Sequence, residues 1–230
     1  MFRGRGSTCA AACLLQFVAV RNVSRTQLKS ERMTQNILYI HGAYASPTTF
    51  RHMIEHLPDH RAAFADYDCL TNSVEDVVRS LKATAAESFG GEPYSIIAHS
   101  LGGVVGLRLA ADDEPVEQIF TMSTPFGGSH TASLLTLVFF TKPVFADINP
   151  HGVTIRGVLR SQIGVPVRSI VSTAGGSPLM HEANDGVVTV ASQTSLAGPE
   201  YHPVAYNHFE VLLADPVIDL AREFLFETAA

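Results

Sequence analysis

Short apolar runs alternate along the chain with longer segments in which apolar residues recur every three or four positions. The runs are five to seven residues long and are followed by segments rich in glycine, serine, histidine or aspartate, which is typical of buried strands. We predict strands at residues 36–40, 62–67, 94–98, 118–122 and 167–173. The periodic segments predict helices that begin near Ser46-Pro47, Ser73, Ser100 and Asp215-Pro216.

The regular alternation of strand and helix predicts an α/β fold, with a doubly wound, mostly parallel sheet and helices on both faces. In such a sheet the functional residues gather in the loops after the carboxyl ends of the strands. These loops carry His41-Gly42, Ser100, Thr124-Pro125, the segment around Asp185, and His208. The pattern therefore predicts one site built from residues that are far apart in the sequence.

The connection between Ser123 and Val167 has about forty residues and no clear strand. We predict a cap inserted into the domain between about residues 126 and 165, with a lid-like segment at residues 129–162. Its most apolar part is the window Leu134 to Phe145. This window fits either a buried helix that packs on the sheet or a lid whose apolar face lines an acyl pocket or contacts a lipid surface.

The sequence YSIIAHSLGGVVGLRLA, from Tyr94 to Ala110, places Ser100 between a predicted strand and a predicted helix. Ala98 and Gly102 lie two residues before and after it, where a sharp turn leaves room only for small side chains. The spacing is that of the nucleophile elbow, G-x-S-x-G, with alanine in place of the first glycine. A helix-capping serine followed by closely packed glycines has the same local pattern, so the rest of the chain must decide.

A serine hydroxyl becomes a good nucleophile when a histidine accepts its proton and an acidic side chain orients that histidine. We favour His208, in a loop before the last helices, as the base over His202, which lies in or beside a strand. The preferred acid is Asp185, in the turn N-D-G-V-V, over Glu182 and Asp147. The resulting chain order of serine, aspartate and histidine is that of hydrolases with an elbow serine.

Nucleophilic attack on a carbonyl also requires two hydrogen-bond donors for the oxyanion that forms. The first candidate is the backbone N–H of Leu101, directly after Ser100 at the start of a helix. The second is expected from the turn at His41-Gly42, where the N–H of Ala43 is preferred to that of Tyr44.

Five segments in this order, HGAYASPTTF, AHSLGG, STPFGGS, NDGVVTVASQ and NHFEVL, together resemble the α/β-hydrolase fold and, within it, the lipase and esterase branch. The resemblance covers about residues 36–228. It implies a catalytic triad of Ser100, Asp185 and His208, an oxyanion hole formed by Ala43 and Leu101, and no cofactor or metal ion. Besides the elbow alanine, Ala45 departs from the glycine that many lipases keep after the His-Gly pair.

Composition and charge bear on the expected partners and on the division of the chain into domains. The chain has 230 residues, 46% of them hydrophobic, and a net charge of −6 without a basic cluster in its main part, which argues against a nucleic-acid partner. Residues 1–32 carry a net charge of +5, which leaves −11 on the rest. We therefore expect a basic leader at residues 1–32 and an α/β-hydrolase domain at residues 33–230.

The leader contains an apolar run of 12 residues, Cys9 to Val20, which is shorter than the roughly 20 residues that span a bilayer. Three interpretations stay open: a signal peptide, an organellar transit peptide, or translation that starts at Met33 instead. The expected compartment is cytoplasmic in the last case and secreted or organellar in the others.

The leading expectation is a serine hydrolase that cleaves carboxylic esters, with a lipophilic acyl group favoured by the apolar window. Its expected partners are a small-molecule or lipid ester and, transiently, a lipid surface that touches the insertion. Two alternatives remain. The same residues could serve acyl transfer or thioester hydrolysis, or the chain could be a catalytically silent lipid-binding protein of this fold.

Overall fold

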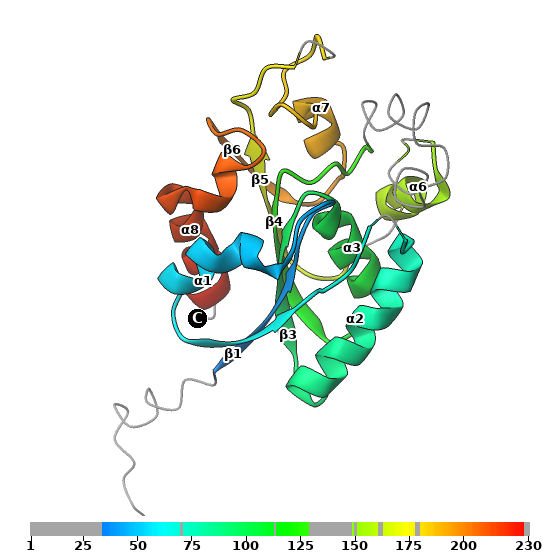
Figure 1. The fold of residues 1–230 in the computed structure, drawn as a ribbon, viewed down its shortest axis with the longest axis vertical. Coiled ribbons are helices and arrows are strands. Elements are labelled where there is room, and N and C mark those ends of the chain that lie inside the picture. The colour runs from blue at the N-terminus through cyan, green and yellow to red at the C-terminus, as the bar shows by residue number, and fades with distance from the viewer. Residues whose placement is uncertain are drawn as a thin grey trace, which may run out of the picture. The chain divides into compact units, whose positions relative to one another are not determined.

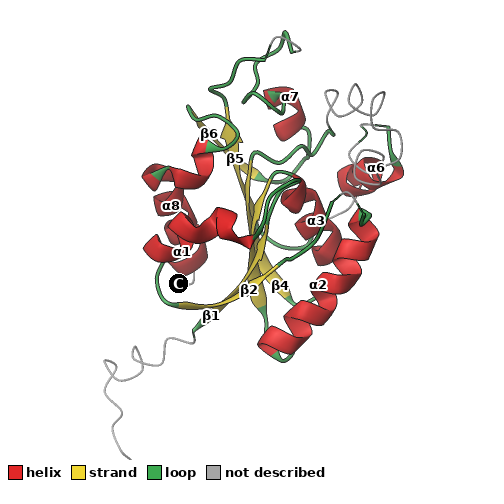
Figure 2. Ribbon diagram, viewed as in Figure 1, coloured by secondary structure: helices red, strands yellow, loops and turns green. Residues whose placement is uncertain are grey.

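A computed structural model describes residues 34–69, 71–112, 114–128, 149, 151–160, 163–177 and 180–227. In this part of the chain six parallel strands form one sheet in the order β2-β1-β3-β4-β5-β6, with helices on both faces (Figures 1 and 2). The strands are β1 (Gln35–Ile40), β2 (His60–Phe64), β3 (Tyr94–His99), β4 (Val116–Met122), β5 (Val167–Ser172) and β6 (Glu200–Val204). The predicted doubly wound α/β architecture is confirmed.

The helices alternate with the strands along the chain. They are η1 (Pro47–Phe50), α1 (Arg51–His56), α2 (Val74–Phe89), α3 (Leu101–Ala110), α6 (Val153–Arg160), α7 (Val190–Gln193), η2 (Glu210–Leu213), α8 (Asp215–Arg222) and the π-helical turn η3 (Glu223–Glu227). The basic leader and the apolar window Leu134 to Phe145 lie outside the described residues. Within the described residues, no helix has the length and apolar character needed to cross a membrane.

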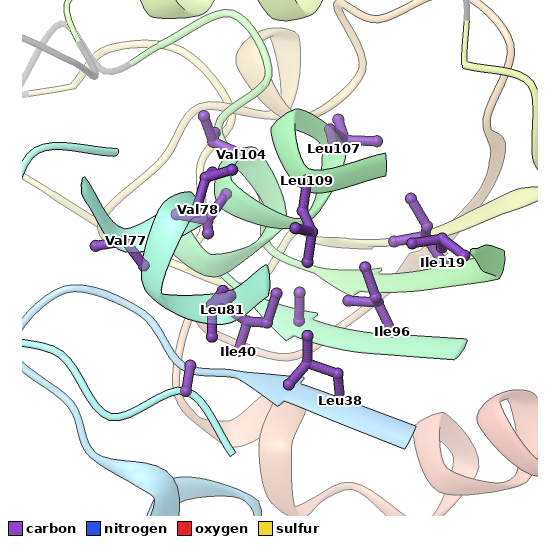
Figure 3. Packing of buried hydrophobic residues seen from close by; sticks show 14 of the residues in the cluster. Leu38, Ile40, Val77, Val78, Leu81, Ile96, Val104, Leu107, Leu109 and Ile119 are labelled. Carbon is purple, nitrogen blue, oxygen red and sulfur yellow. The ribbon is translucent and has the colours of Figure 1, made fainter. Parts of the chain in front are cut away.

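The inner strands β1, β3, β4 and β5 are mostly apolar because their side chains enter two separate cores, one on each face of the sheet. On one face, alternate strand residues such as Leu38, Ile96 and Ile119 pack against α2 and α3 (Figure 3). On the other face, their neighbours Ile37 and Phe120 pack against α1, α8 and η3. The fully buried residues of β1, β3 and β5 thus remove apolar surface from water on both faces, which stabilises the sheet between its two helical layers.

The helix α6 lies within the predicted insertion. Its side chains Ile155 and Val158 are fully buried and belong to the same core as α3. The described part of the insertion therefore packs as a core helix. The lid-like interpretation of the remaining insertion concerns residues outside those that the structure describes.

Several predicted boundaries differ from the structure, among them the start of β4, which is Val116 rather than residue 118. The strand predicted at residues 62–67 is instead His60–Phe64, because Tyr67 turns away from the ladder and stacks on the ring of His41 with centroids 4.3 Å apart. Helix α8 has Ala214 as its N-cap, and Asp215 lies in its first turn rather than capping it. The capping box predicted at Ser73 is confirmed, since its side chain accepts the N–H of Asp76 at 3.2 Å.

The strand order locates the site. The chain passes from β1 outward to β2, then returns to the other side of β1 to form β3. The loops that follow β1 and β3 therefore diverge, and such a switch point between neighbouring parallel strands leaves a crevice where ligands bind. These two loops carry Ala43 and Ser100.

Candidate active site

Ser100 occupies the turn that joins the end of β3 directly to the start of α3. Its backbone has a φ of 54° and a ψ of −123°, a conformation that a residue with a Cβ adopts only at a cost. Its N–H donates to the carbonyl oxygen of Met122 at 2.9 Å, which ties the turn to the neighbouring strand β4. The predicted strand–serine–helix arrangement is therefore present, and the turn lifts the Ser100 side chain out of the sheet.

The glycines after Ser100 are required by the close approach of α3 to the sheet. A Cβ at Gly102 would lie 2.1 Å from the carbonyl oxygen of Ile40, and one at Gly103 would lie 2.0 Å from Oγ1 of Thr124. Both distances are far below any real contact, so no larger residue fits without moving the helix. The small residues predicted around the serine have this steric cause.

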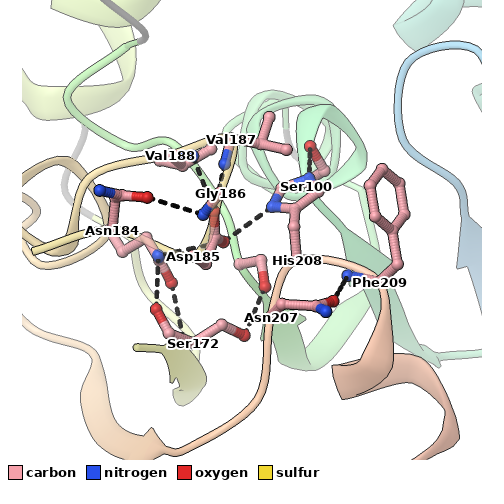
Figure 4. Close-up of polar contacts among 12 residues, drawn as sticks. Ser100, Ser172, Asn184, Asp185, Gly186, Val187, Val188, Asn207, His208 and Phe209 are labelled. Carbon is pink, nitrogen blue, oxygen red and sulfur yellow. Dashed lines mark hydrogen bonds and ion pairs between the residues drawn. The ribbon is translucent and has the colours of Figure 1, made fainter. Parts of the chain in front are cut away.

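His208 links Ser100 to Asp185. Its Nε2 lies 3.0 Å from Oγ of Ser100, and its Nδ1 lies 2.7 Å from Oδ2 of Asp185 (Figure 4). A carboxylate only accepts hydrogen bonds, so Nδ1 carries the proton and Nε2 presents its lone pair to the serine hydroxyl. Ser100 therefore donates to a histidine that is ready to accept its proton. The structure brings these three sequence-predicted residues together from three different loops.

Asp185 is held in a buried turn after β5, with only 1% of its surface exposed. Its Oδ1 accepts the N–H groups of Val187 and Val188 at 2.9 and 2.7 Å. Gly175 packs against this turn so closely that a Cβ there would lie 1.9 Å from the carbonyl carbon of Asp185. The turn is thus fixed by backbone donors on one side and a glycine on the other.

His99, the residue before Ser100, supports His208. Its Nε2–H donates to the carbonyl oxygen of His208 at 2.8 Å, and the two rings lie 4.8 Å apart. Burial lowers the pKa of His99 to about 3, which keeps its ring neutral and leaves Nε2 as the donor. The N–H of His208 donates to the carbonyl oxygen of Asp185 at 3.0 Å, so the base is held through its backbone as well.

The two predicted oxyanion donors lie in the turn after β1, at Ala43, and at the start of α3, at Leu101. Among the described residues, the N–H groups of Ala43 and Leu101 have no protein acceptor, whereas the N–H of Tyr44 donates to Sγ of Cys69 at 3.4 Å. Tyr44, the second choice from the sequence, is therefore already engaged. The turn is braced by Tyr67, whose hydroxyl donates to the carbonyl oxygen of His41 at 2.5 Å.

The competing candidates lie elsewhere. His202 is on β6, and its ring pairs with the carboxylate of Glu200 at 2.8 Å. Glu182 is exposed, and Asp147 lies outside the described residues. The part of the chain that the structure describes contains no group of three or more His, Cys, Asp or Glu side chains able to hold a metal ion.

Exposed apolar side chains lie in three of the loops that form the site, those of Ala43, His208 and Asp185. Tyr44 is 66% exposed and follows Ala43, Phe209 is 65% exposed and follows His208, and Val187 is 37% exposed in the Asp185 turn. The ring of Phe209 stands edge-on to that of His208, with centroids 5.3 Å apart (Figure 4). Large exposed apolar groups near polar ones are typical of a binding surface for an apolar ligand.

The sequence analysis did not identify several residues that support this site. Gln193 hydrogen-bonds to Asp185 from α7, Tyr67 braces the oxyanion turn, and His99 holds the backbone of His208. The available signals were weak: a glycine pair at Gly175 and a histidine next to Ser100. Each role depends on a contact between segments that are distant in the chain.

Solved structures identify the fold. The chain is similar to the mature lipase BlEst2 from Bacillus licheniformis, with a TM-score of 0.67 and 16% identity over 85% of this chain and 93% of that one. It is similar to carboxylesterase CesB (YbfK) from Bacillus subtilis, with a TM-score of 0.60 and 16% identity over 85% of each chain. It is also similar to phospholipase PlaB from Legionella pneumophila, with a TM-score of 0.62 and 14% identity over 77% of this chain.

The chain spans about half of that phospholipase, 54% of its length. No protein-family model matches the sequence, and no curated protein does. The similarity in structure shows the fold without close kinship to any of these proteins. The protein has the α/β-hydrolase fold, as the sequence resemblance implied.

Proposed function

We propose that this protein is a serine hydrolase that cleaves carboxylic esters through an acyl-enzyme at Ser100. One observation carries the proposal: the continuous hydrogen-bonded chain from Ser100 through His208 to the buried Asp185, with distances of 3.0 and 2.7 Å. The lipases and esterases of the same fold support the assignment, since ester hydrolysis is the activity that their names give.

In the first half of the reaction, Oγ of Ser100 attacks the ester carbonyl carbon while Nε2 of His208 accepts the hydroxyl proton. Asp185 keeps the proton on Nδ1 and stabilises the imidazolium ion. The carbonyl oxygen becomes an oxyanion, which accepts hydrogen bonds from the N–H groups of Leu101 and Ala43. Collapse of this intermediate expels the alcohol, which takes the proton from Nε2, and the acyl group stays on Ser100.

In the second half, water replaces the alcohol. His208 removes a proton from the water as it attacks the acyl-enzyme, and the same two N–H groups stabilise the second oxyanion. The carboxylic acid leaves as Ser100 recovers its proton. Apart from the ester and this water, every step uses groups of this chain, and no step requires a cofactor.

The acyl group of the preferred substrate is lipophilic. The exposed side chains of Tyr44, Phe209 and Val187 support this part of the proposal, because they offer apolar surface on the loops that carry Ala43, His208 and Asp185. An acyl chain that covers them removes apolar surface from water, and each buried methylene contributes up to about 0.8 kcal/mol.

A fluorophosphonate probe followed by peptide mapping tests the assignment. The probe forms a bond to an activated serine, so we expect a single label on Ser100 and none in Ser100→Ala. Ser80→Ala is the matched control, since Ser80 is an exposed serine on α2. Its labelling should equal that of the wild type. Labelling at another residue, or none in the folded wild type, would contradict the proposed function.

A further inference from the structure

Gln193, the last residue of α7, is completely buried between the end of β5 and the carboxylate of Asp185. Its Oε1 accepts the N–H of Ser172 at 2.9 Å. Its Nε2 donates to the carbonyl oxygen of Ser172 at 3.0 Å and to Oδ2 of Asp185 at 3.2 Å. Both amide hydrogens of this side chain are therefore used, one of them on the acid of the site.

Ser172 determines which end of the Gln193 carboxamide faces Asp185. Its N–H requires an oxygen and its carbonyl requires an N–H, so a flipped amide would set donor against donor and acceptor against acceptor. The second N–H of Nε2 is thereby aimed at Oδ2, the oxygen that also accepts Nδ1–H of His208. The backbone of Ser172, at the end of β5, thus fixes the direction in which Nε2 of Gln193 donates to Asp185.

The two oxygens of Asp185 are held by different kinds of partner. Among the described residues, Oδ1 accepts two backbone N–H groups, whereas Oδ2 accepts hydrogen bonds from the side chains of His208 and Gln193. Without the second donor, the position of Oδ2 would depend on the same histidine that it has to orient. In a buried site the direction of such a hydrogen bond matters more than in water, because no solvent replaces a misaligned partner.

We propose that Gln193 is a positioning residue, which fixes the plane of the Asp185 carboxylate and so keeps His208 aligned with Ser100. This inference rests on the proposed ester hydrolysis and deepens it. Gln193 touches neither substrate nor the reacting atoms. It acts through Asp185, so its loss should lower kcat while substrate binding is retained.

Gln193→Glu is the sharpest test, because it keeps the size and one oxygen for the N–H of Ser172. The second oxygen faces two acceptors, the carbonyl of Ser172 and Oδ2 of Asp185. We expect kcat to fall about ten- to a hundredfold, with KM within about twofold of the wild type. Burial favours the neutral acid, which still donates one hydrogen, so the loss should grow as rising pH ionises it.

Two further variants separate positioning from packing. Gln193→Met fills the same space without a donor, so kcat should fall without the added loss at high pH. Thr189→Ala removes the cap of α7, in which Oγ1 accepts the N–H of Ser192 at 3.2 Å, and leaves the amide contacts in place. It should lower the melting temperature and keep kcat within about twofold.

The readouts are kcat, KM and the pH profile on a soluble ester, with a thermal melt of the full chain. Wild-type kcat in both folded Gln193 variants would overturn the inference while the proposed function stands. A loss of kcat in Thr189→Ala equal to that in Gln193→Met would also overturn it, since helix packing would explain both. A wild type as inactive as Ser100→Ala would overturn the proposed function itself, and this inference with it.

Discussion

The backbone of Ser100 shows how a single residue is prepared for chemistry. Its positive φ costs about 1–3 kcal/mol and persists because the surrounding contacts determine it. Its N–H donates to the carbonyl oxygen of Met122. Gly102 and Gly103, which follow it, allow α3 to pack directly against the sheet. This strained turn places the Ser100 hydroxyl within hydrogen-bond distance of Nε2 of His208.

The two candidate histidines give a direct test at this scale. His208→Ala should lower kcat about ten-thousandfold, as should Ser100→Ala, because each removes a reacting group. Asp185→Ala should cost less, since His208 is also held by His99 and by its own backbone. His202→Ala is the matched control and should keep the wild-type rate. The reverse result for the two histidines would show that the base is assigned wrongly.

A second prediction at the residue scale concerns Tyr44 and Phe209. In the wild type kcat/KM should rise from acetyl to octanoyl p-nitrophenyl esters, by no more than about 4.8 kcal/mol for six methylenes. Changing both residues to serine should flatten this rise and spare acetyl hydrolysis, since neither belongs to the triad. Leu213→Ser on η2, an equally exposed apolar position at 62%, should keep the rise. A wild-type series that is flat or falls with length would exclude the lipophilic acyl group.

At the scale of elements, the contact between α3 and the sheet decides whether the site exists. The helix begins at Leu101, and Gly102 and Gly103 in its first turn lie too close to the end of β1 and to Thr124, after β4, for a Cβ to fit. This contact sets the position of the Leu101 N–H, one of the two proposed oxyanion donors. Stability and activity should therefore change together when it is disturbed.

Two helical glycines make this testable. Gly103→Ala places a methyl group 2.0 Å from Oγ1 of Thr124, so it should destabilise the fold by about 1–3 kcal/mol and reduce ester turnover. In Gly157→Ala, in α6, the added Cβ has no atom of the described residues within 4 Å, so it should stabilise by about 0.5–1 kcal/mol, the usual gain from alanine in a helix. Urea unfolding measures both. Equal effects of the two substitutions would contradict the close contact of α3.

The sequence predicted the elements whose pattern is local. The central strands and α2 followed from apolar runs and a capping box, and Ser100, Asp185 and His208 followed from motifs in a known order. The edge strand β2 was placed two residues late, because it is only partly buried and its apolar pattern is weak. Gln193 and Tyr67 escaped notice, since their roles are defined by partners that no neighbouring residue indicates.

At the scale of the whole molecule, burial of polar groups makes stability depend on pH. His99 is fully enclosed, and burial lowers its pKa from an ordinary value near 6.5 to about 3. In the unfolded chain the same side chain regains its ordinary pKa. Between about pH 6.5 and 3 the unfolded state therefore binds one more proton at this residue, so acid favours unfolding.

The free energy of unfolding should accordingly fall by about 1.4 kcal/mol for each pH unit through the middle of this window, as far as His99 contributes. His99→Gln keeps an N–H donor for the carbonyl of His208 and cannot titrate, so its pH dependence should be shallower. His151→Gln, at an exposed histidine, is the control. Urea unfolding at pH 7, 6 and 5 gives the comparison. Parallel curves for wild type and His99→Gln would contradict the buried neutral state.

The ladder between β4 and β5 divides the chain into two halves with unlike contents. The part before it contains Ser100 and the proposed oxyanion donors, and the part after it contains Asp185 and His208, the proposed acid and base. Neither half holds all the residues of the proposed active site. The chain could be produced as two pieces that are divided within the long connection between β4 and β5. Each piece alone should be inactive, and a mixture should recover turnover only as far as the pieces reassemble. The rate of ester hydrolysis at different concentrations of the two pieces would then measure how strongly they bind one another.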